Sequence, residues 1–285
     1  MTGARGFVGQ RLVRRLEQEG AYVTGWDKRD GMDLCDWRVV QACRMGRNLD
    51  AVYHLAAVSY VPFAWKYPRE VCQANLLSTL NILEFCRVRK VKRLVYVSSY
   101  VYGTPVRLPI GEDHPVAPAN PYAWSKLIGE QLCTAYSRLF DLPVIIIRPF
   151  NIYGPGQAET FLVPTILRQA RRSTVIRLEN LTPRRDLLYV DDMVEALVRA
   201  RKMSGRRFEI VNLGAGKSYS VREIAGEIGR GSGHVPRLVS RRKIRRGEVM
   251  DVVADTRKAR RLLNWQPATV LKQGLAKIWT EQLHA

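Results

Sequence analysis

The chain has 285 residues and 46% of them are hydrophobic, so it can bury a sizeable core and is not globally disordered. No apolar run approaches the ~18 residues of a membrane-spanning helix, and the first 25 residues carry charges throughout, unlike a signal peptide. Lysine and arginine number 46 against 26 acidic residues, a formal net charge of +20 at pH 7. This charge indicates an anionic partner, from a nucleotide diphosphate up to RNA, or a solvated arginine-rich surface. We favour the solvated surface and expect neither nucleic acid nor a membrane as partner.

Cysteine and histidine spacing gives no sign of a disulfide framework or a metal site. The five cysteines are scattered without a C-x-x-C pair, and the four histidines lack H-x-x-x-H spacing. We therefore expect reduced thiols, a cytoplasmic location and no bound metal.

The chain opens with MTGARGFVGQRL, in which Gly3, Gly6 and Gly9 have the G-x-x-G-x-x-G spacing of a dinucleotide-binding turn. Such a turn follows a strand at the centre of a parallel sheet and aims a helix N-terminus at a pyrophosphate. Only Met1 and Thr2 precede it here. We therefore expect that the first strand is missing and that the chain is truncated by a start assigned too late. The alternative is that another segment fills the gap.

An acidic residue follows the turn at the distance that the dinucleotide motif requires. Asp27 lies 18 residues after Gly9, at the end of a strand-like run. A carboxylate there accepts both ribose hydroxyls of adenosine, which favours NAD, whereas basic neighbours such as Arg29 leave NADP possible. Asp33, in GMDLCD, is placed to touch adenine, or is an ordinary loop residue.

Short apolar runs alternate with amphipathic patterns over the first half of the chain, which predicts a parallel sheet with helices on both faces. We expect strands at 21–26, 49–57, 91–99 and 142–150, and helices at 68–88 and 122–140.

Beyond Arg148 the pattern becomes irregular, with proline and glycine in RPFNIYGPGQ. This indicates a smaller lobe packed on the sheet. We expect a dinucleotide-binding domain of residues 1–148 plus about 185–212, and a substrate-binding lobe of about 149–184 plus 213–285.

The stretch NPYAWSKLIGEQL places Tyr122 and Lys126 four residues apart, on one face of a helix. A nearby ammonium favours the phenolate form of a phenol whose pKa is ordinarily near 10. Tyr122 would then take a proton from a substrate alcohol while hydride goes to a nicotinamide. Ser98, in VYVSSYVYG, ends a strand 24 residues before Tyr122 and would orient the reacting oxygen. Alone, each pattern also fits a surface helix pair or a turn.

Taken together, the motifs resemble the extended short-chain dehydrogenase/reductase family, in its nucleotide-sugar epimerase/dehydratase branch. They are TGARGFVG, HLAAVSYVP, NLLSTLNILE, VSSYVYG, PYAWSK, RPFNIYGPGQ, RRDLLYVDD, NLGAG and LLNWQP. The resemblance implies a Rossmann-type, doubly wound parallel sheet with a smaller α/β substrate lobe. It also implies a nicotinamide cofactor and a nucleoside-diphosphate sugar oxidised or reduced at C4.

By position in the family motifs, the resemblance implies a catalytic set of Ser98, Tyr122 and Lys126. It implies cofactor contacts at Gly3, Gly6, Phe7, Val8, Gly9, Asp27, Asp33, Leu34, Leu55, Ala56, Ala57, Asn75, Tyr122, Lys126 and Pro149. It implies substrate contacts at Ser99, Asn151, Arg185 and Arg245, since arginine pairs well with a diphosphate.

One departure bears on the reaction. Sugar 4,6-dehydratases of this family carry an acid just after the serine position, because eliminating water needs an acid and a base. Here Ser99 and Tyr100 stand there. We therefore expect an epimerase or a 4-ketoreductase, although AAVSYVPFAWKYP and ENLTPRRD look most like the GDP-mannose dehydratase and GDP-4-keto-sugar reductase group. A 4,6-dehydratase is the alternative, and a non-catalytic RNA-binding relative is the alternative of another class.

The resemblance also implies a homodimer. The helices expected at 68–88 and 122–140 match those that pair in the family's dimers as a four-helix bundle. The alternative is that their outer faces are merely solvated.

Overall fold

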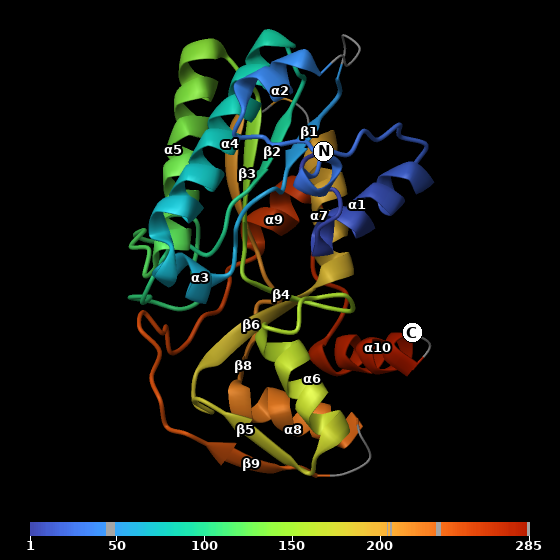
Figure 1. Ribbon diagram of the computed structural model, residues 1–285, viewed down its shortest axis with the longest axis vertical. Coiled ribbons are helices and arrows are strands. Elements are labelled where there is room, and N and C mark those ends of the chain that lie inside the picture. The colour runs from blue at the N-terminus through green and yellow to red at the C-terminus, as the bar shows by residue number, and fades with distance from the viewer. Residues whose placement is uncertain (44–48, 204, 206, 232–234, 284–285) are drawn as a thin grey trace.

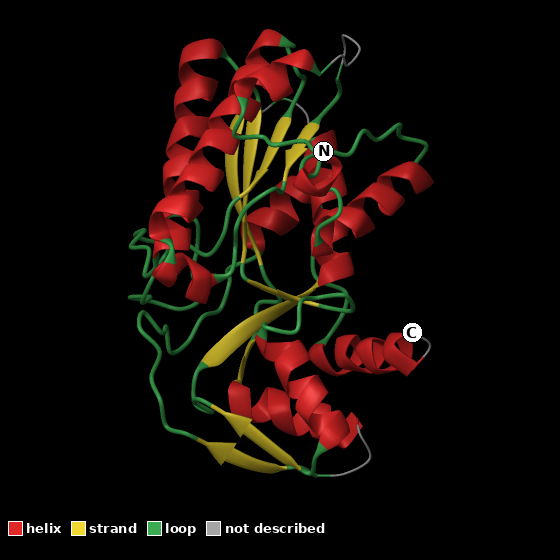
Figure 2. Cartoon of the chain, viewed as in Figure 1, coloured by secondary structure: helices red, strands yellow, loops and turns green. Residues whose placement is uncertain are grey.

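The computed structural model describes residues 1–43, 49–203, 205, 207–231 and 235–283. A parallel sheet covered by helices forms one end of the molecule, and a smaller group of strands and helices forms the other (Figures 1 and 2). The predicted α/β fold class is confirmed.

The main sheet has the strand order β1-β2-β3-β7, and all of its strands are parallel. The strands are β1 (Val52–His54), β2 (Leu94–Val97), β3 (Val144–Pro149) and β7 (Phe208–Leu213). Helices α4 (Pro68–Val88) and α5 (Pro121–Phe140) cover one face, and α1 (Phe7–Gln18) and α7 (Val190–Lys202) cover the other (Figure 1). Because both faces are covered, β2 and the first four residues of β3 are continuous apolar runs. Strands β1, β2 and β3 lie within the predicted strands at 49–57, 91–99 and 142–150.

Met1 and Thr2 occupy the place beside β1 where the expected first strand would end. Thr2 forms parallel bridges to both Trp26 and His54. The predicted strand at 21–26 is wrong, because Trp26 alone of these residues forms a bridge. A strand needs a neighbour of matching length, and from 21–26 only Thr24 and Trp26 form hydrogen bonds with Met1, each of 2.7 Å, in the part of the chain that the structure describes.

Helix α5 carries the tyrosine–lysine pair and begins with a standard cap. Asn120 Oδ1 accepts the Ala123 N–H at 2.9 Å, and Pro121 occupies the first helical position. The helix buries the face that bears Ala123, Lys126, Leu127, Glu130 and Cys133. Two charged side chains therefore point into the packed side of α5.

The smaller assembly has a three-stranded sheet of order β4-β6-β8 and a parallel pair, β5 with β9. Its strands are β4 (Asn151–Tyr153), β5 (Val175–Leu178), β6 (Arg184–Tyr189), β8 (Ser218–Ser220) and β9 (Arg237–Ser240). Its helices are α6 (Leu162–Arg172), α8 (Val221–Gly231) and α10 (Leu271–Leu283). Side chains such as Ile166, Ile224 and Leu275 form its own core.

The remaining elements are η1 (Lys28–Asp30), α2 (Trp37–Ala42), α3 (Val61–Lys66) and α9 (Arg257–Leu263). Helix α9 returns to the main sheet, where Leu263 packs in the same core cluster as Leu12 and Leu197. Within the described ranges, no helix combines the length and the apolar composition needed to cross a bilayer.

Candidate active site

The glycine turn packs tightly against the loop after β1. Gly3 has φ +67°, and a Cβ on it would lie 2.9 Å from the Ala56 nitrogen. A Cβ on Gly9 would lie 2.1 Å from the Gly3 carbonyl oxygen. Helix α1 begins at Phe7 with Gly6 as its N-cap, and no side chain caps it. This shape fits a pyrophosphate, because the first amides of a helix bind anions when no side chain takes them.

His54 at the end of β1 holds the residue before the glycine turn through a buried hydrogen bond. Its Nδ1 lies 2.7 Å from Thr2 Oγ1, and its Nε2 lies 3.1 Å from Thr79 Oγ1. Burial lowers the pKa of His54 to about 3, so the ring is neutral. Thr2 Oγ1 also accepts the Ala56 N–H at 3.2 Å, which joins the turn to the loop of Leu55, Ala56 and Ala57.

Asp27 lies next to the glycine turn, as the spacing predicts. One of its carboxylate oxygens accepts the Arg5 N–H at 3.1 Å, and the other accepts the Arg29 N–H at 3.2 Å. Asp33 is half exposed and accepts the Cys35 N–H at 3.0 Å, and its neighbour Leu34 is buried. The acidic residue and the turn are thus brought together.

Asn75 binds other parts of the protein. Its side chain exchanges two hydrogen bonds with the backbone of Val58, at 2.8 and 3.2 Å. It also donates to Ser125 Oγ at 2.8 Å, and Ser125 donates in turn to the Tyr122 carbonyl at 2.7 Å. Asn75 therefore ties the loop after β1 to the first turn of α5.

Tyr122 and Ser99 lie close enough for the Ser99 side chain to act on the pKa of the phenol. Burial raises the pKa of Tyr122 above its usual value, and the side chain of Ser99 acts in the opposite direction. Ser99, which the sequence predicts to contact substrate, thus lies next to the predicted proton-transfer residue.

Lys126 is almost fully buried, and its Nζ lies 4.2 Å from the centre of the Tyr96 ring. Burial lowers the pKa of Lys126 to about 8, and Cys133 and Glu130 act in the opposite direction. A charged ammonium over an aromatic face is stabilised by the ring quadrupole.

Ser98 donates from Oγ to Glu130 Oε1 at 2.5 Å, and both residues are buried. The sequence reasoning missed Glu130. The available signal was its position four residues after Lys126 on the same helix face, although a glutamate there reads equally well as solvated.

The predicted substrate residues are spread over the junction between the two assemblies. Arg185 in β6 donates to the Val249 carbonyl at 2.8 Å, and its charge interacts with that of Arg245. Asn151 Nδ2 lies 3.4 Å from the Asp186 carbonyl, and Pro149 is buried at the end of β3. Arg185 is thus close enough to Arg245 and to Tyr100, which follows β2, for their charges to act on it.

A family model described as the NAD-dependent epimerase/dehydratase family matches residues 1–214. The chain belongs to this family. It is 34% identical to a UDP-glucose 4-epimerase of Mycolicibacterium smegmatis over 311 residues, which cover 97% of this chain and 96% of that protein. It is 32% identical over 245 residues to a GDP-6-deoxy-D-mannose reductase of Pseudomonas aeruginosa, covering 81% of this chain and 80% of that one.

A solved structure described as MoeE5 in complex with UDP-glucose and NAD has a TM-score of 0.89 with this chain at 29% identity. The match covers 100% of this chain and 98% of MoeE5. These findings confirm the resemblance and the nicotinamide cofactor of the family.

Tyr100 takes the place of the carboxylate that the family's 4,6-dehydratases carry. Its hydroxyl donates to the Gly103 carbonyl at 2.5 Å, and burial raises its pKa. The ring packs against Tyr102 and Phe150. A phenol held in this way is a poor base.

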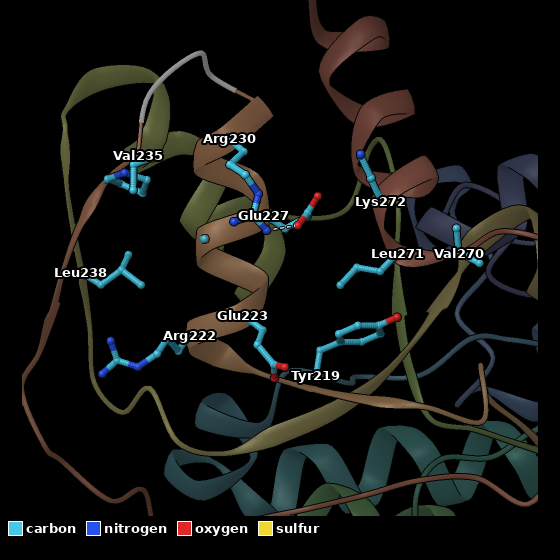
Figure 3. Close-up of a pocket in the computed structure, with 12 residues that line it drawn as sticks. Tyr219, Arg222, Glu223, Glu227, Arg230, Val235, Leu238, Val270, Leu271 and Lys272 are labelled. Carbon is cyan, nitrogen blue, oxygen red and sulfur yellow. Dashed lines mark hydrogen bonds and ion pairs between the residues drawn. The ribbon is translucent and has the colours of Figure 1, made fainter.

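A pocket elsewhere in the molecule has no part in this site. It lies in the smaller assembly between α8, β9 and the start of α10, and an ion pair between Glu227 and Arg230 stands at its wall (Figure 3). None of the predicted site residues lines it. Over the residues that the structure describes, no group of three or more His, Cys, Asp and Glu side chains is arranged to hold a metal ion.

Proposed function

We propose that this chain is an NAD-dependent 4-epimerase of a nucleoside-diphosphate hexose, with a UDP-sugar as the first candidate. The observation that carries the proposal is the group of Ser98, Ser99, Tyr122 and Lys126 beside a glycine turn, with Tyr100 where an eliminating enzyme needs a carboxylate. Such a set can exchange a proton with a substrate alcohol, but it includes no carboxyl group to catalyse the elimination of water from the sugar.

In this proposal Tyr122 takes the proton of the C4 hydroxyl and later returns it. The side chain of Ser99 stabilises the phenolate, and Ser98 orients the C4 oxygen. Lys126 supplies positive charge beneath the site. When bound, NAD accepts hydride from C4 and gives it back. A 4-epimer forms if the keto sugar turns over before the hydride returns.

We propose that Gly3, Gly6 and Gly9 with the start of α1 hold the pyrophosphate, and that Asp27 binds the adenosine ribose. Leu55, Ala56 and Ala57, in the loop after β1, would line the same cofactor site. A carboxylate at the position of Asp27 repels the 2′-phosphate of NADP, so NAD is favoured. The MoeE5 structure, which carries NAD in its description, supports this choice.

We propose that the second lobe selects the sugar nucleotide. Arg185 and Arg245 would pair with the diphosphate, and Asn151 would contact it from β4. The lobe would consist of about 149–184 and 213–285, with α9 packed back on the main sheet. Burial lowers the pKa of Arg185, and Glu248 opposes this shift.

A 4-ketoreductase is the second candidate. The observation in its favour is the 32% identity to the GDP-6-deoxy-D-mannose reductase, together with Arg5 and Arg29 beside Asp27. These two arginines would pair with a 2′-phosphate, and NADP would then serve as the cofactor.

We propose a homodimer formed through α4 and α5. Both helices leave large apolar side chains exposed, among them Leu80 in α4 and Trp124 and Phe140 in α5. Light scattering should give twice the monomer mass for the unmodified protein and the mass of one monomer for Leu80→Glu.

The free cysteines make a reducing, cytoplasmic location the simplest proposal.

The experiment is a product analysis. The protein is incubated with NAD and a panel of UDP-, GDP-, dTDP- and CDP-sugars, and the products are weighed and separated. An isomer of unchanged mass, formed without added NADH and abolished in Tyr122→Phe, supports the epimerase. A gain of two hydrogens by a 4-keto sugar indicates the reductase, and loss of one water contradicts both.

A further inference from the structure

The buried hydroxyl of Ser98 is held by a carboxylate from the neighbouring helix. Ser98 follows β2, Glu130 lies two turns into α5, and their oxygen atoms are 2.5 Å apart. Each residue is 3% exposed or less. A serine hydroxyl ordinarily samples three staggered rotamers, so an acceptor at this distance selects one of them.

Glu130 is itself fixed from the other side. Arg148 in β3 donates to both of its oxygens, with Nε at 2.9 and 3.2 Å and Nη2 at 2.6 Å. The guanidinium and the carboxylate are both buried, at 5% and 4% side-chain exposure. This planar, two-point pairing leaves Glu130 little freedom to turn.

The chain of contacts continues beyond Arg148. Its Nη1 donates to Tyr102 Oη at 2.9 Å, and Tyr102 donates to Asn212 Oδ1 at 2.6 Å. The Asn212 N–H reaches Glu112 at 2.8 Å. Tyr102 and Asn212 thus hold the guanidinium of Arg148 beside Glu130, whereas Glu112 only accepts a backbone N–H further away.

We propose that Glu130 is a positioning residue that fixes the hydroxyl of Ser98 for reaction at C4. This inference rests on the function proposed above. A buried ion pair is weak evidence for stability, since two well-packed apolar side chains often do as well. A role in positioning requires a direct contact, and Ser98, the serine predicted to meet the substrate, donates a short hydrogen bond to the carboxylate of this pair.

The test is a double-mutant cycle on kcat with Ser98→Ala, Glu130→Gln and the two combined. We expect Ser98→Ala to lower kcat by about 100-fold and Glu130→Gln by about 10-fold to 100-fold, because small misplacements of a catalytic group cost this much. If Glu130 acts through Ser98, the double variant falls no lower than Ser98→Ala, within about threefold. Losses that multiply would overturn the proposal.

Glu112→Gln is the matched control. It makes the same chemical change, but Glu112 accepts only the Asn212 backbone N–H and touches none of Ser98, Glu130 and Arg148 in the contacts described. Its kcat should stay within about threefold of the wild type. If Glu130→Gln does not fold, the joint replacement Glu130→Leu with Arg148→Met removes both charges together and takes its place in the cycle.

A second readout does not depend on turnover. Crystal structures of Glu130→Gln and Glu112→Gln, each with NAD, show where Ser98 Oγ lies. We expect it to leave its position in the first variant and keep it in the second. An unmoved Ser98 in Glu130→Gln overturns the positioning role even if no nucleotide sugar reacts, whereas a moved Ser98 in a protein without activity rejects only the proposed function.

Discussion

Lys126 Nζ lies 4.2 Å from the centre of the Tyr96 ring, on the buried side of α5. The lysine is 2% exposed, and burial is the largest influence on its pKa. The partial compensation by Cys133 and Glu130 leaves the pKa at about 8, far below that of a free lysine. Lys126 therefore titrates at about pH 8, in a range where activity can be measured.

The first prediction concerns the pH dependence of activity. Lys126 is charged below about pH 8 and neutral above it, so kcat/KM should fall as the pH rises through this value. Lys126→Met should lower the maximum by about 100-fold and remove this alkaline limb. A wild-type profile that stays flat to pH 10, or a limb that persists in the variant, would show that Lys126 is not the titrating group.

The second prediction concerns packing behind Lys126. A Cβ on Gly129 would lie 2.1 Å from Tyr96 Oη, so Gly129→Ala should push the ring and cost about 1–3 kcal/mol of unfolding free energy. Gly226 in α8 is the control, because a Cβ there meets no atom within 4 Å. Gly226→Ala should be neutral or stabilise by up to about 1 kcal/mol. Urea denaturation measures both, and equal effects would refute the contact.

The third prediction concerns cofactor choice. Asp27→Asn should raise the dissociation constant of NAD about tenfold or more, because a charge-assisted hydrogen bond is worth about 1.5–3 kcal/mol. Binding of NADP should change less or improve. Asp50→Asn is the control, since Asp50 is exposed and pairs with Lys92 away from the turn. Calorimetric titrations that show the same change for both cofactors would argue against a ribose contact.

The fourth prediction concerns stability and pH. Burial raises the pKa of Asp186 from 3.8 to about 6, although the N–H groups of Ala215, Gly216 and Ala254 act in the opposite direction. The folded carboxyl thus binds its proton more tightly than the unfolded one. Its contribution is fully present below about pH 4 and is lost as the pH rises through about 6.

The expected size of this loss is about 2–3 kcal/mol for a shift of this magnitude. Asp186→Asn should have a lower unfolding free energy overall, because an amide cannot accept all three N–H groups. Its unfolding free energy should not show the fall between about pH 4 and 6 that Asp186 causes. Denaturation at several pH values between 4 and 7 compares the two proteins. Parallel curves would mean that Asp186 does not titrate in this range.

Much of the fold follows from pattern alone. The helices expected at 68–88 and 122–140 match α4 and α5 closely, because each is a long, uninterrupted 3.6-residue pattern that begins at a proline. The prediction of a strand at 21–26 was wrong because a strand also needs a partner strand. This segment has an alternating apolar pattern, but only Met1 and Thr2 lie beside it.

The site was harder to predict than the fold. Helical spacing placed Tyr122 and Lys126 on one face, but spacing does not say that Lys126 turns to Tyr96 or that Ser99 reaches Tyr122. The pair of Glu130 and Arg148 joins a helix to a strand 18 residues later, and only the packed structure brings them together. Buried polar contacts between elements leave no periodic signal in a sequence.

The most direct measurement follows the hydrogen on C4. UDP-glucose and UDP-glucuronic acid, each carrying deuterium at C4, are incubated with the protein and NAD without added reductant. The account predicts that one of them yields its C4 epimer with deuterium retained at C4, because the same hydride leaves and returns. Loss of one water with transfer of deuterium to another carbon would contradict it, as would reduction of a 4-keto sugar by NADPH without any epimer.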